Sequence, residues 1–161
     1  MQIAGLPPHP LLVHLVVVLV PCAALSFVAT MWRPAWRRDY LWLVAAIALV
    51  GGVGAILAAQ SGEALEDAIR AAAAAGHRPQ LDPHPDQGDV AEMTSALFAF
   101  VVVGMWALQR FASQRMPAWA WTALYGAGVL AAIGALIAVV MAGDSGARLV
   151  WLDPGSFPGI K

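Results

Sequence analysis

HPLLVHLVVVLVPCAALSFVATMW, residues 9–32, decides the fold class of this chain. The stretch is almost purely apolar after His14, and its length is close to the ~20 residues that an α-helix needs to cross ~30 Å of hydrocarbon. Four such stretches occur, at about 10–32, 40–60, 90–112 and 119–142. The sequence therefore predicts an all-α integral membrane protein, a bundle of four transmembrane helices.

The composition of the whole chain supports this prediction. Of its 161 residues, 60% are hydrophobic and 12% are charged, whereas soluble domains carry ~25% charged residues. No polar region remains outside the spans, so residues 1–161 are expected to form a single transmembrane domain. No basic residue precedes the first span, so we do not expect it to be a cleavable signal.

Basic residues gather in the first and third connections between spans. These two short loops carry five of the nine basic residues, namely Arg33, Arg37, Arg38, Arg110 and Arg115. The middle connection, 61–89, has an acidic excess instead. Because basic loops tend to stay in the cytoplasm, we predict a protein of the bacterial inner membrane with both termini and loop 61–89 on the extracytoplasmic side.

The middle connection has two parts of different composition. SGEALEDAIRAAAAAG, residues 61–76, is rich in alanine and has apolar residues at helical spacing, so it predicts an extra outer-side helix between spans two and three or a prolongation of span two. Proline and glycine in 77–89 argue against regular helix there. Asp89 is the predicted N-cap of the third span.

Side chains that can bind metals or carry protons gather at the predicted outer ends of all four helices. The candidate metal ligands are His9, His14, Glu63, His84 and Asp144, with Ser61 and Asp89 as residues that would orient them. Imidazoles with carboxylates suit divalent transition metals, and two facing imidazoles suit haem b, for which His14 and His84 are the candidate ligands. The alternative for His14 is a hydrogen-bonded histidine that holds helices together.

Established catalytic motifs are absent from the sequence. It contains no GxSxG, P-loop, HExxH, CxxC or CxxCH motif, and the single Cys22 cannot form an intrachain disulfide. The confinement of basic residues to short loops gives no support to nucleic-acid binding. No internal repeat is predicted beyond the shared pattern of two spans around an arginine loop.

Four motifs resemble an uncharacterised bacterial family of four-pass membrane proteins, a domain of unknown function. The motifs are GLPPHPLLVHLVVVLVP, QSGEALED, HPDQGD and GDSGARLVW, which occur in the family's order over positions 5–151. Some relatives in that family are fused to Rieske iron–sulfur domains, which implies redox work. The resemblance marks His9, His14, Ser61, Gly62, Glu63, His84, Gly88, Asp89, Gly143, Ser145, Gly146 and Trp151. Asp144 departs from the family pattern, in which histidine is frequent, so a haem site that used this position could not form.

Three functions are compatible with these observations. The first is an accessory or assembly subunit of a larger membrane complex, or a homo-oligomer, embedded in the lipid bilayer. The second is a redox or metal-binding protein with a haem b or metal site at the outer end of the bundle. The third is proton or ion transport, for which the cytoplasmic half of the spans offers no ionisable relay.

Overall fold

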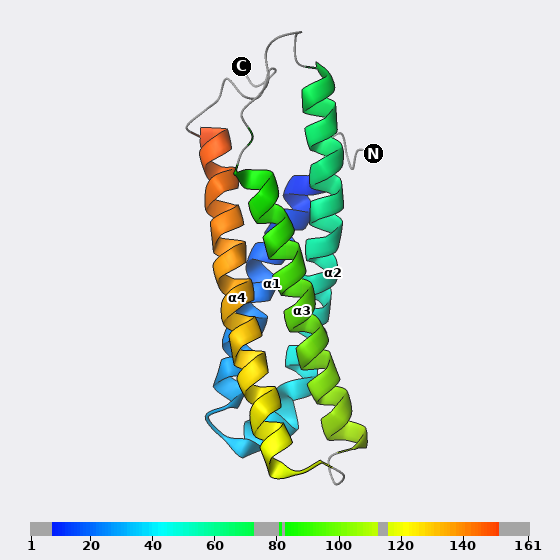
Figure 1. Cartoon of the computed structure of the whole chain (residues 1–161), viewed down its shortest axis with the longest axis vertical. Coiled ribbons are helices and arrows are strands. Elements are labelled where there is room, and N and C mark those ends of the chain that lie inside the picture. The colour runs from blue at the N-terminus through cyan, green and yellow to red at the C-terminus, as the bar shows by residue number, and fades with distance from the viewer. Residues whose placement is uncertain (1–7, 73–80, 82, 113–115, 152–161) are drawn as a thin grey trace.

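Four long antiparallel helices make up the computed structural model, which describes residues 8–72, 81, 83–112 and 116–151 (Figure 1). The helices are α1 (Pro8–Thr30), α2 (Pro34–Ala72), α3 (His84–Phe111) and α4 (Ala118–Trp151). Each contains an apolar window long enough to cross a membrane. The described residues contain no strand, so the predicted all-α class with four membrane-spanning helices is confirmed.

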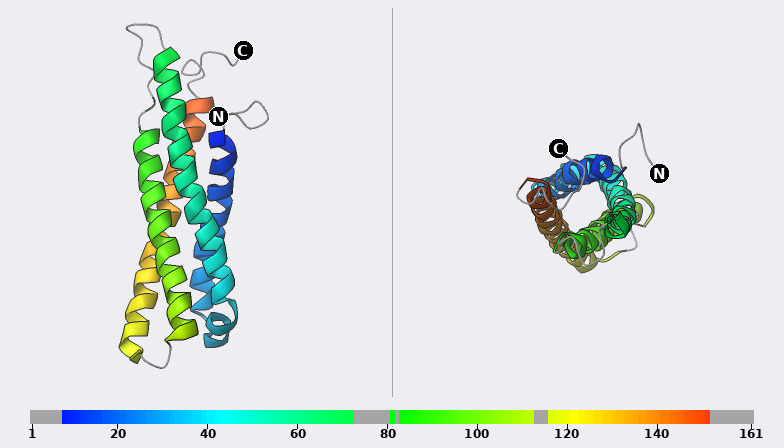
Figure 2. Two further views of the ribbon diagram at one scale, coloured as in Figure 1. Left: turned by 90° about the vertical axis from the view of Figure 1, so that its right-hand side faces the viewer. Right: turned by 90° about the horizontal axis from the view of Figure 1, so that it is seen from above.

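The helices close into a ring in which each packs against its two neighbours. α1 contacts α2, α2 contacts α3, α3 contacts α4 and α4 returns to α1, as the view from above shows (Figure 2). α1 and α3 are therefore diagonal partners across the ring. We call the end that carries His9, Ser61, His84 and Ser145 the histidine end, and the opposite end, with Arg33, Arg38 and Arg110, the arginine end.

The interior of the ring is filled by small and aromatic side chains. Phe27 of α1 and Phe98 of α3 meet edge to face, with ring centroids 6.0 Å apart. Gly128 of α4 makes room for Phe27, because a Cβ there would lie 2.5 Å from the Phe27 Cζ atom. Small residues thus allow close packing of the helices, as their abundance in α2 and α4 predicts.

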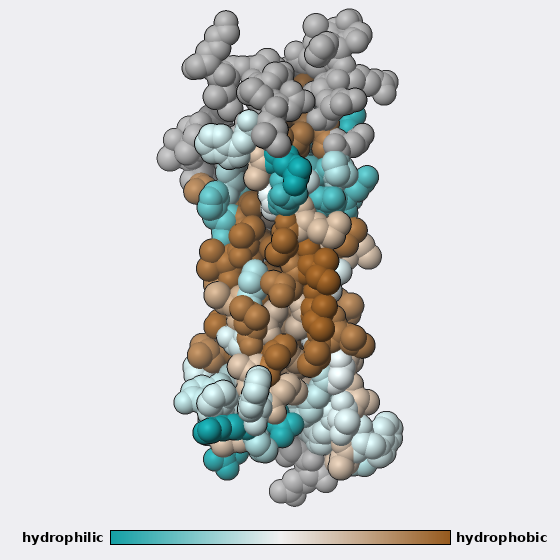
Figure 3. Space-filling view, turned by 90° about the vertical axis from the view of Figure 1, so that its left-hand side faces the viewer, coloured by the Kyte–Doolittle hydropathy of each residue, from teal (hydrophilic) through white to brown (hydrophobic). Residues whose placement is uncertain are grey.

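The outer surface of the bundle suits hydrocarbon. Large apolar side chains such as Leu25, Phe100 and Leu130 are exposed, and one face shows a continuous apolar band between two more polar ends (Figure 3). Trp32 and Trp119 are exposed at the arginine end and Trp151 at the opposite end. Tryptophan prefers the interface between lipid and water, so the apolar band has the position of a membrane core.

The helices are longer than the apolar spans in the sequence. Residues 61–72 continue α2 without a break, so a separate outer-side helix is not confirmed, and the described part of this segment is the prolongation of span two. Gly76 and His77 lie outside the described residues. The prediction that residues 77–89 contain no regular helix is wrong for 84–89, because α3 already begins at His84.

Asp89 is not the N-cap of α3, and that prediction was wrong. The cap residue is Pro83, and Pro85 lies in the first turn. Proline is tolerated there because the first backbone N–H groups of a helix have no partner within it. Asp89 therefore lies within the helix, with its side chain exposed.

The two halves of the chain repeat one burial pattern. The buried residues of α1 are Val16, Val20, Ala23, Ala24, Phe27 and Thr30, and those of α3 are Ala91, Ser95, Phe98, Ala99, Val102 and Met105. Each α3 position follows its α1 counterpart by 75 residues (91 minus 16). In α2 and α4, the buried positions 44, 48, 51, 54 and 55 correspond to the buried positions 128, 132, 135, 138 and 139 at an offset of 84 (128 minus 44). The bundle thus has an approximate twofold axis along its length, which the sequence analysis missed.

Candidate histidine pair at one end of the bundle

Two histidines face each other across the ring at the histidine end. His9 lies in the first turn of α1 and His84 begins α3, and both side chains are partly buried. Their ring centroids are 6.2 Å apart and their planes are inclined by 76°. They are equivalent positions of the repeat, since 84 minus 9 is again 75. The approximate twofold axis therefore brings the same residue type to the same place twice.

The imidazole of His9 is anchored on α2. Its Nδ1 atom lies 2.9 Å from the carbonyl oxygen of Ala58 and 3.4 Å from Oγ of Ser61. The Ser61 hydroxyl donates to the same carbonyl oxygen at 2.8 Å. Because a carbonyl oxygen only accepts hydrogen bonds, the hydrogen of the neutral ring is on Nδ1, and Nε2 keeps a free lone pair.

The imidazole of His84 is anchored on α4 in the same way. Its Nδ1 atom lies 3.1 Å from Oγ of Ser145, a buried hydroxyl. Ser145 donates its own hydrogen to the carbonyl oxygen of Ala142 at 3.1 Å, so its oxygen is left to accept from Nδ1. His84 is thus held in the same tautomer as His9, again with a free lone pair on Nε2.

A glycine follows each of these serines and leaves space for the ring. A Cβ on Gly62 would lie 3.0 Å from Cε1 of His9, and a Cβ on Gly146 would lie 2.9 Å from Cε1 of His84. Both distances are shorter than ordinary van der Waals contacts between carbon atoms. Each imidazole therefore packs directly against the backbone of the helix that anchors it, and any side chain at these positions would displace it.

The separation of the two rings is compatible with two imidazoles that share one metal. Metal–nitrogen bonds of about 2.0–2.1 Å, with each ring nitrogen about 1.2 Å from its centroid, place two collinear imidazoles about 6.4 Å apart. The observed separation is 6.2 Å. Histidine ligands generally donate their other ring N–H to a carbonyl, carboxylate or water, as Nδ1 of His9 does here. Imidazole nitrogen suits iron, copper, nickel and zinc.

The other predicted ligands do not join this pair. His14 is exposed, and its Nδ1 atom contacts the backbone oxygen of Pro10 in its own helix. Five residues separate it from His9, which turns it about 140° around the helix. Glu63 and Asp144 are also exposed, and Asp144 pairs with Arg148 at 2.7 Å. Within the described ranges, no three side chains of His, Cys, Asp or Glu converge to hold a metal ion.

Several residues at the pair are absent from the predicted set of ligands and orienting residues. Ser145 and Gly146 were marked by the family resemblance, and Gln87 was not marked at all. Gln87 lies one turn after His84, and its Oε1 atom is buried without a hydrogen-bond partner in the described part of the chain. The sequence did hold a signal for the pair, because His-Pro occurs at 9–10 and 84–85 and Ser-Gly at 61–62 and 145–146.

Comparisons with known proteins identify the family without an activity. A family model described as "Predicted membrane protein (DUF2231)" matches residues 5–154, which is most of the chain. The resemblance seen in the four sequence motifs is thereby confirmed. No curated protein and no solved structure matches the chain.

Proposed function

Because the chain belongs to the DUF2231 family of predicted membrane proteins, whose description assigns no activity, we propose its function from the histidine pair. We propose that His9 and His84 hold haem b at the histidine end and that the protein is an electron-carrying accessory subunit of a larger membrane complex. The observation that carries the proposal is the pair of facing imidazoles 6.2 Å apart, each with a free Nε2.

The donor set of the pair suits a haem. Two imidazole nitrogens could hold such a cofactor without a third protein ligand. The residues of α2 and α4 that contact or anchor the rings are all small, namely Ala58, Ser61, Gly62, Ala142, Ser145 and Gly146. Haem with two imidazole ligands supplies reversible one-electron transfer.

The side chains of the site would hold and orient the cofactor rather than react with a substrate. Ala58 and Ser145 would fix the ring tautomers, Gly62 and Gly146 would fix the ring positions, and the buried apolar core begins about two turns further along α3 at Ala91. If both histidines hold a haem, neither ring would remain free to act on a substrate. Electrons would therefore come from and go to partner proteins, which supports the accessory role.

A metal ion without porphyrin is the second candidate, and Gln87 favours it. Its buried Oε1 atom has no partner among the described residues and lies on the turn of α3 that follows His84. A water molecule bound to a copper or zinc ion between the imidazoles would donate the missing hydrogen bond. The same experiment distinguishes this candidate from haem.

We do not propose transport. The buried polar side chains of the described core are Thr30, Ser95 and Ser145, all of them hydroxyls, which support no chain of ionisable groups across the bundle. We propose from the distribution of arginines that the arginine end faces the cytoplasm and the histidine end the opposite side of the inner membrane.

The test is the absorption spectrum and metal content of the protein purified in mild detergent. We expect a Soret band, about one haem per chain, and loss of both in His84→Ala. His14→Leu is the matched control, because it removes an exposed histidine one and a half turns from His9, and it should keep the cofactor. A stoichiometric metal without a Soret band would select the second candidate. Neither cofactor, or loss of cofactor in His14→Leu alone, would contradict the proposal.

A further inference from the structure

A groove at the arginine end lies far from the histidine pair and plays no part in the proposed function. It has a volume of about 510 Å³ and lies between α2 and α3. The residues that line it are Arg38, Leu41, Trp42, Trp106, Gln109 and Arg110. Its volume is in the range of small-molecule sites, and it combines cations, aromatic rings and an amide.

The two arginines leave their charge available to an anion. Arg38 forms an ion pair with the adjacent Asp39, with Nε of Arg38 3.0 Å from Oδ1 of Asp39. The Arg38 side chain is 79% exposed and the Asp39 side chain 49% exposed. Exposed pairs of this kind contribute little stability. Arg110 lies over the ring of Phe111 at 5.5 Å, a contact that leaves its N–H donors free. A phosphate is the anion that guanidinium groups match best.

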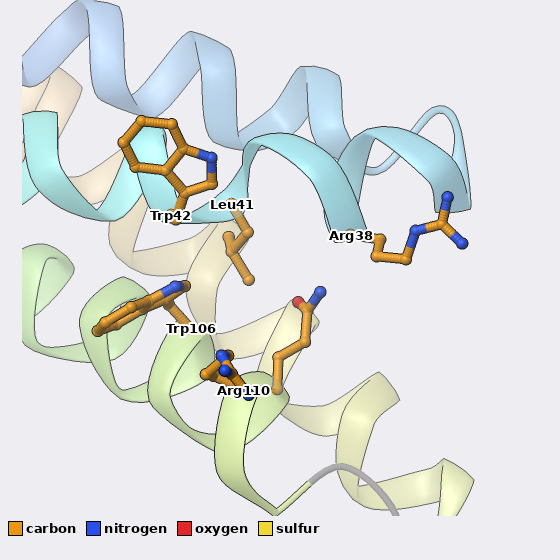
Figure 4. Close-up of a pocket in the computed structure, with 6 residues that line it drawn as sticks. Arg38, Leu41, Trp42, Trp106 and Arg110 are labelled. Atoms are coloured by element: carbon orange, nitrogen blue, oxygen red, sulfur yellow. The ribbon is translucent and has the colours of Figure 1, made fainter.

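The two tryptophans place the groove at the depth of lipid headgroups. Trp42 of α2 and Trp106 of α3 flank Leu41 on facing helices, with Arg110 beside Trp106 and Arg38 extending toward the arginine end (Figure 4). Indole rings prefer the region where the lipid glycerol backbone meets water. A basic pocket between transmembrane helices at this depth is typical of sites for anionic lipids.

Gln109 supplies an observation of a different kind. Its Nε2 atom donates to the backbone oxygen of Arg37 at 3.3 Å, which fixes the orientation of the amide. Its Oε1 atom is then buried with no hydrogen-bond partner in the part of the chain that the structure describes. A buried acceptor without a donor is costly, so the groove suits a ligand that carries a hydrogen-bond donor, such as a hydroxyl, as well as a phosphate.

We propose that this groove binds an anionic phospholipid with a hydroxylated headgroup, of the phosphatidylglycerol type. The phosphate lies between Arg38 and Arg110, a headgroup hydroxyl donates to Oε1 of Gln109, and the glycerol backbone packs on Trp42 and Trp106. The lipid would bridge α2 and α3 beside the hydrogen bond that Gln109 already makes to the Arg37 backbone.

Native mass spectrometry of the purified full chain with defined lipids tests this proposal. We expect phosphatidylglycerol to bind about tenfold or more tightly than phosphatidylcholine, which has no net charge. Arg38→Gln with Arg110→Gln should remove this preference. Gln109→Leu should weaken phosphatidylglycerol but leave the binding of phosphatidic acid, which lacks the glycerol headgroup, unchanged.

The control variant removes the same charge elsewhere. Arg33→Gln with Arg148→Gln takes one guanidinium from outside the groove at the arginine end and one from the histidine end, and should keep the lipid preference. Equal binding of the two lipids by the wild type, or equal loss in both double variants, would overturn the proposal. Displacement of the lipid by millimolar glycerol phosphate would show that the groove serves a soluble phosphate instead. If a variant fails to fold, the decisive measurement is made on the wild type alone. Its preference for phosphatidylglycerol over phosphatidylcholine should be lost as the salt concentration rises.

Discussion

Ser61 and Ser145 occupy equivalent positions of the repeat but contribute differently to the histidine pair. Nδ1 of His9 has its main acceptor in the Ala58 backbone at 2.9 Å and lies 3.4 Å from Ser61. Nδ1 of His84 lies 3.1 Å from the Ser145 hydroxyl. A side-chain acceptor can be removed by substitution, whereas a backbone carbonyl cannot. The Ala142 backbone is also a hydrogen-bond partner of His84, so the two halves of the pair differ in which acceptor lies nearest, and His84 depends more on a serine than His9 does but not on it alone.

This difference predicts unequal effects of two matching substitutions. Ser145→Ala leaves Nδ1 of His84 without its side-chain acceptor and should weaken cofactor binding by about 10–100-fold, as loss of a ligand's hydrogen-bond partner generally does. Ser61→Ala leaves the Ala58 carbonyl in place and should have a smaller effect. Titration of the apoprotein with haem, followed at the Soret band, measures both. A larger loss in Ser61→Ala would show that the tautomers are fixed in another way.

The glycines beside the rings give a second prediction. Gly62→Ala and Gly146→Ala should each displace an imidazole, since the new Cβ would lie about 3 Å from ring carbon, and should reduce the cofactor content of the purified protein. Gly88→Ala is the control at the same end of the bundle, because a Cβ there meets no atom within 4 Å. Normal cofactor content in both ring variants would mean that the rings do not pack on α2 and α4 as described.

In the helices themselves, small residues govern how closely the elements approach. Gly128→Ala in α4 would place Cβ 2.5 Å from the ring of Phe27. Such overpacking should destabilise the bundle by about 1–3 kcal/mol, measured as a lower melting temperature in detergent. Gly126→Ala, on the same helix but with no atom within 4 Å of its Cβ, should be neutral or slightly stabilising. Equal melting temperatures for both variants would contradict the close contact of α1 and α4.

The elements also show what the sequence can and cannot predict. Hydropathy finds the four spans, because crossing lipid requires long apolar runs. Alanine content and apolar spacing predicted the polar helical extension at 61–72, whereas the helix at 84–89 was missed because proline and glycine there were taken to break it.

The histidine pair was only half predicted, for a geometric reason. The position of His14 further into the membrane span favoured it as the ligand. Which residues of α1 are buried, however, depends on their angular position around the helix axis. His9 is seven residues, or about two turns, before the buried Val16 and so lies on the same, buried face of α1. His14 is two residues before Val16 and so lies on the opposite face of the helix. Which helix lies diagonal to α1 is a property of the assembled ring and could not be read from one segment.

For the molecule as a whole, the approximate twofold axis explains why one end carries two facing histidines. Two helical hairpins with the same polar motifs place His9 and His84 opposite each other, with Ser61 and Ser145 behind them. Parallel hairpins put both copies of the motif at one end. The opposite end then collects Arg33, Arg38 and Arg110.

The proposed orientation of this axis in the membrane is testable by cysteine labelling. In a Cys22→Ser background, Asp144→Cys should react with a membrane-impermeant maleimide added to intact spheroplasts, because the histidine end faces outward. Asp39→Cys at the arginine end should react only after the membrane is permeabilised. The reverse pattern would place the histidine pair on the cytoplasmic side.

The central claim is that His9 and His84 act as a pair on one ligand. The most direct measurement is a haem titration of the wild type, His9→Ala, His84→Ala and the double variant, with the low-spin spectrum of two axial imidazoles as the readout. We predict that each single variant loses this spectrum and that the double variant binds haem no more weakly than the weaker single variant. Retention of the low-spin spectrum in either single variant would show that the two imidazoles do not share a ligand.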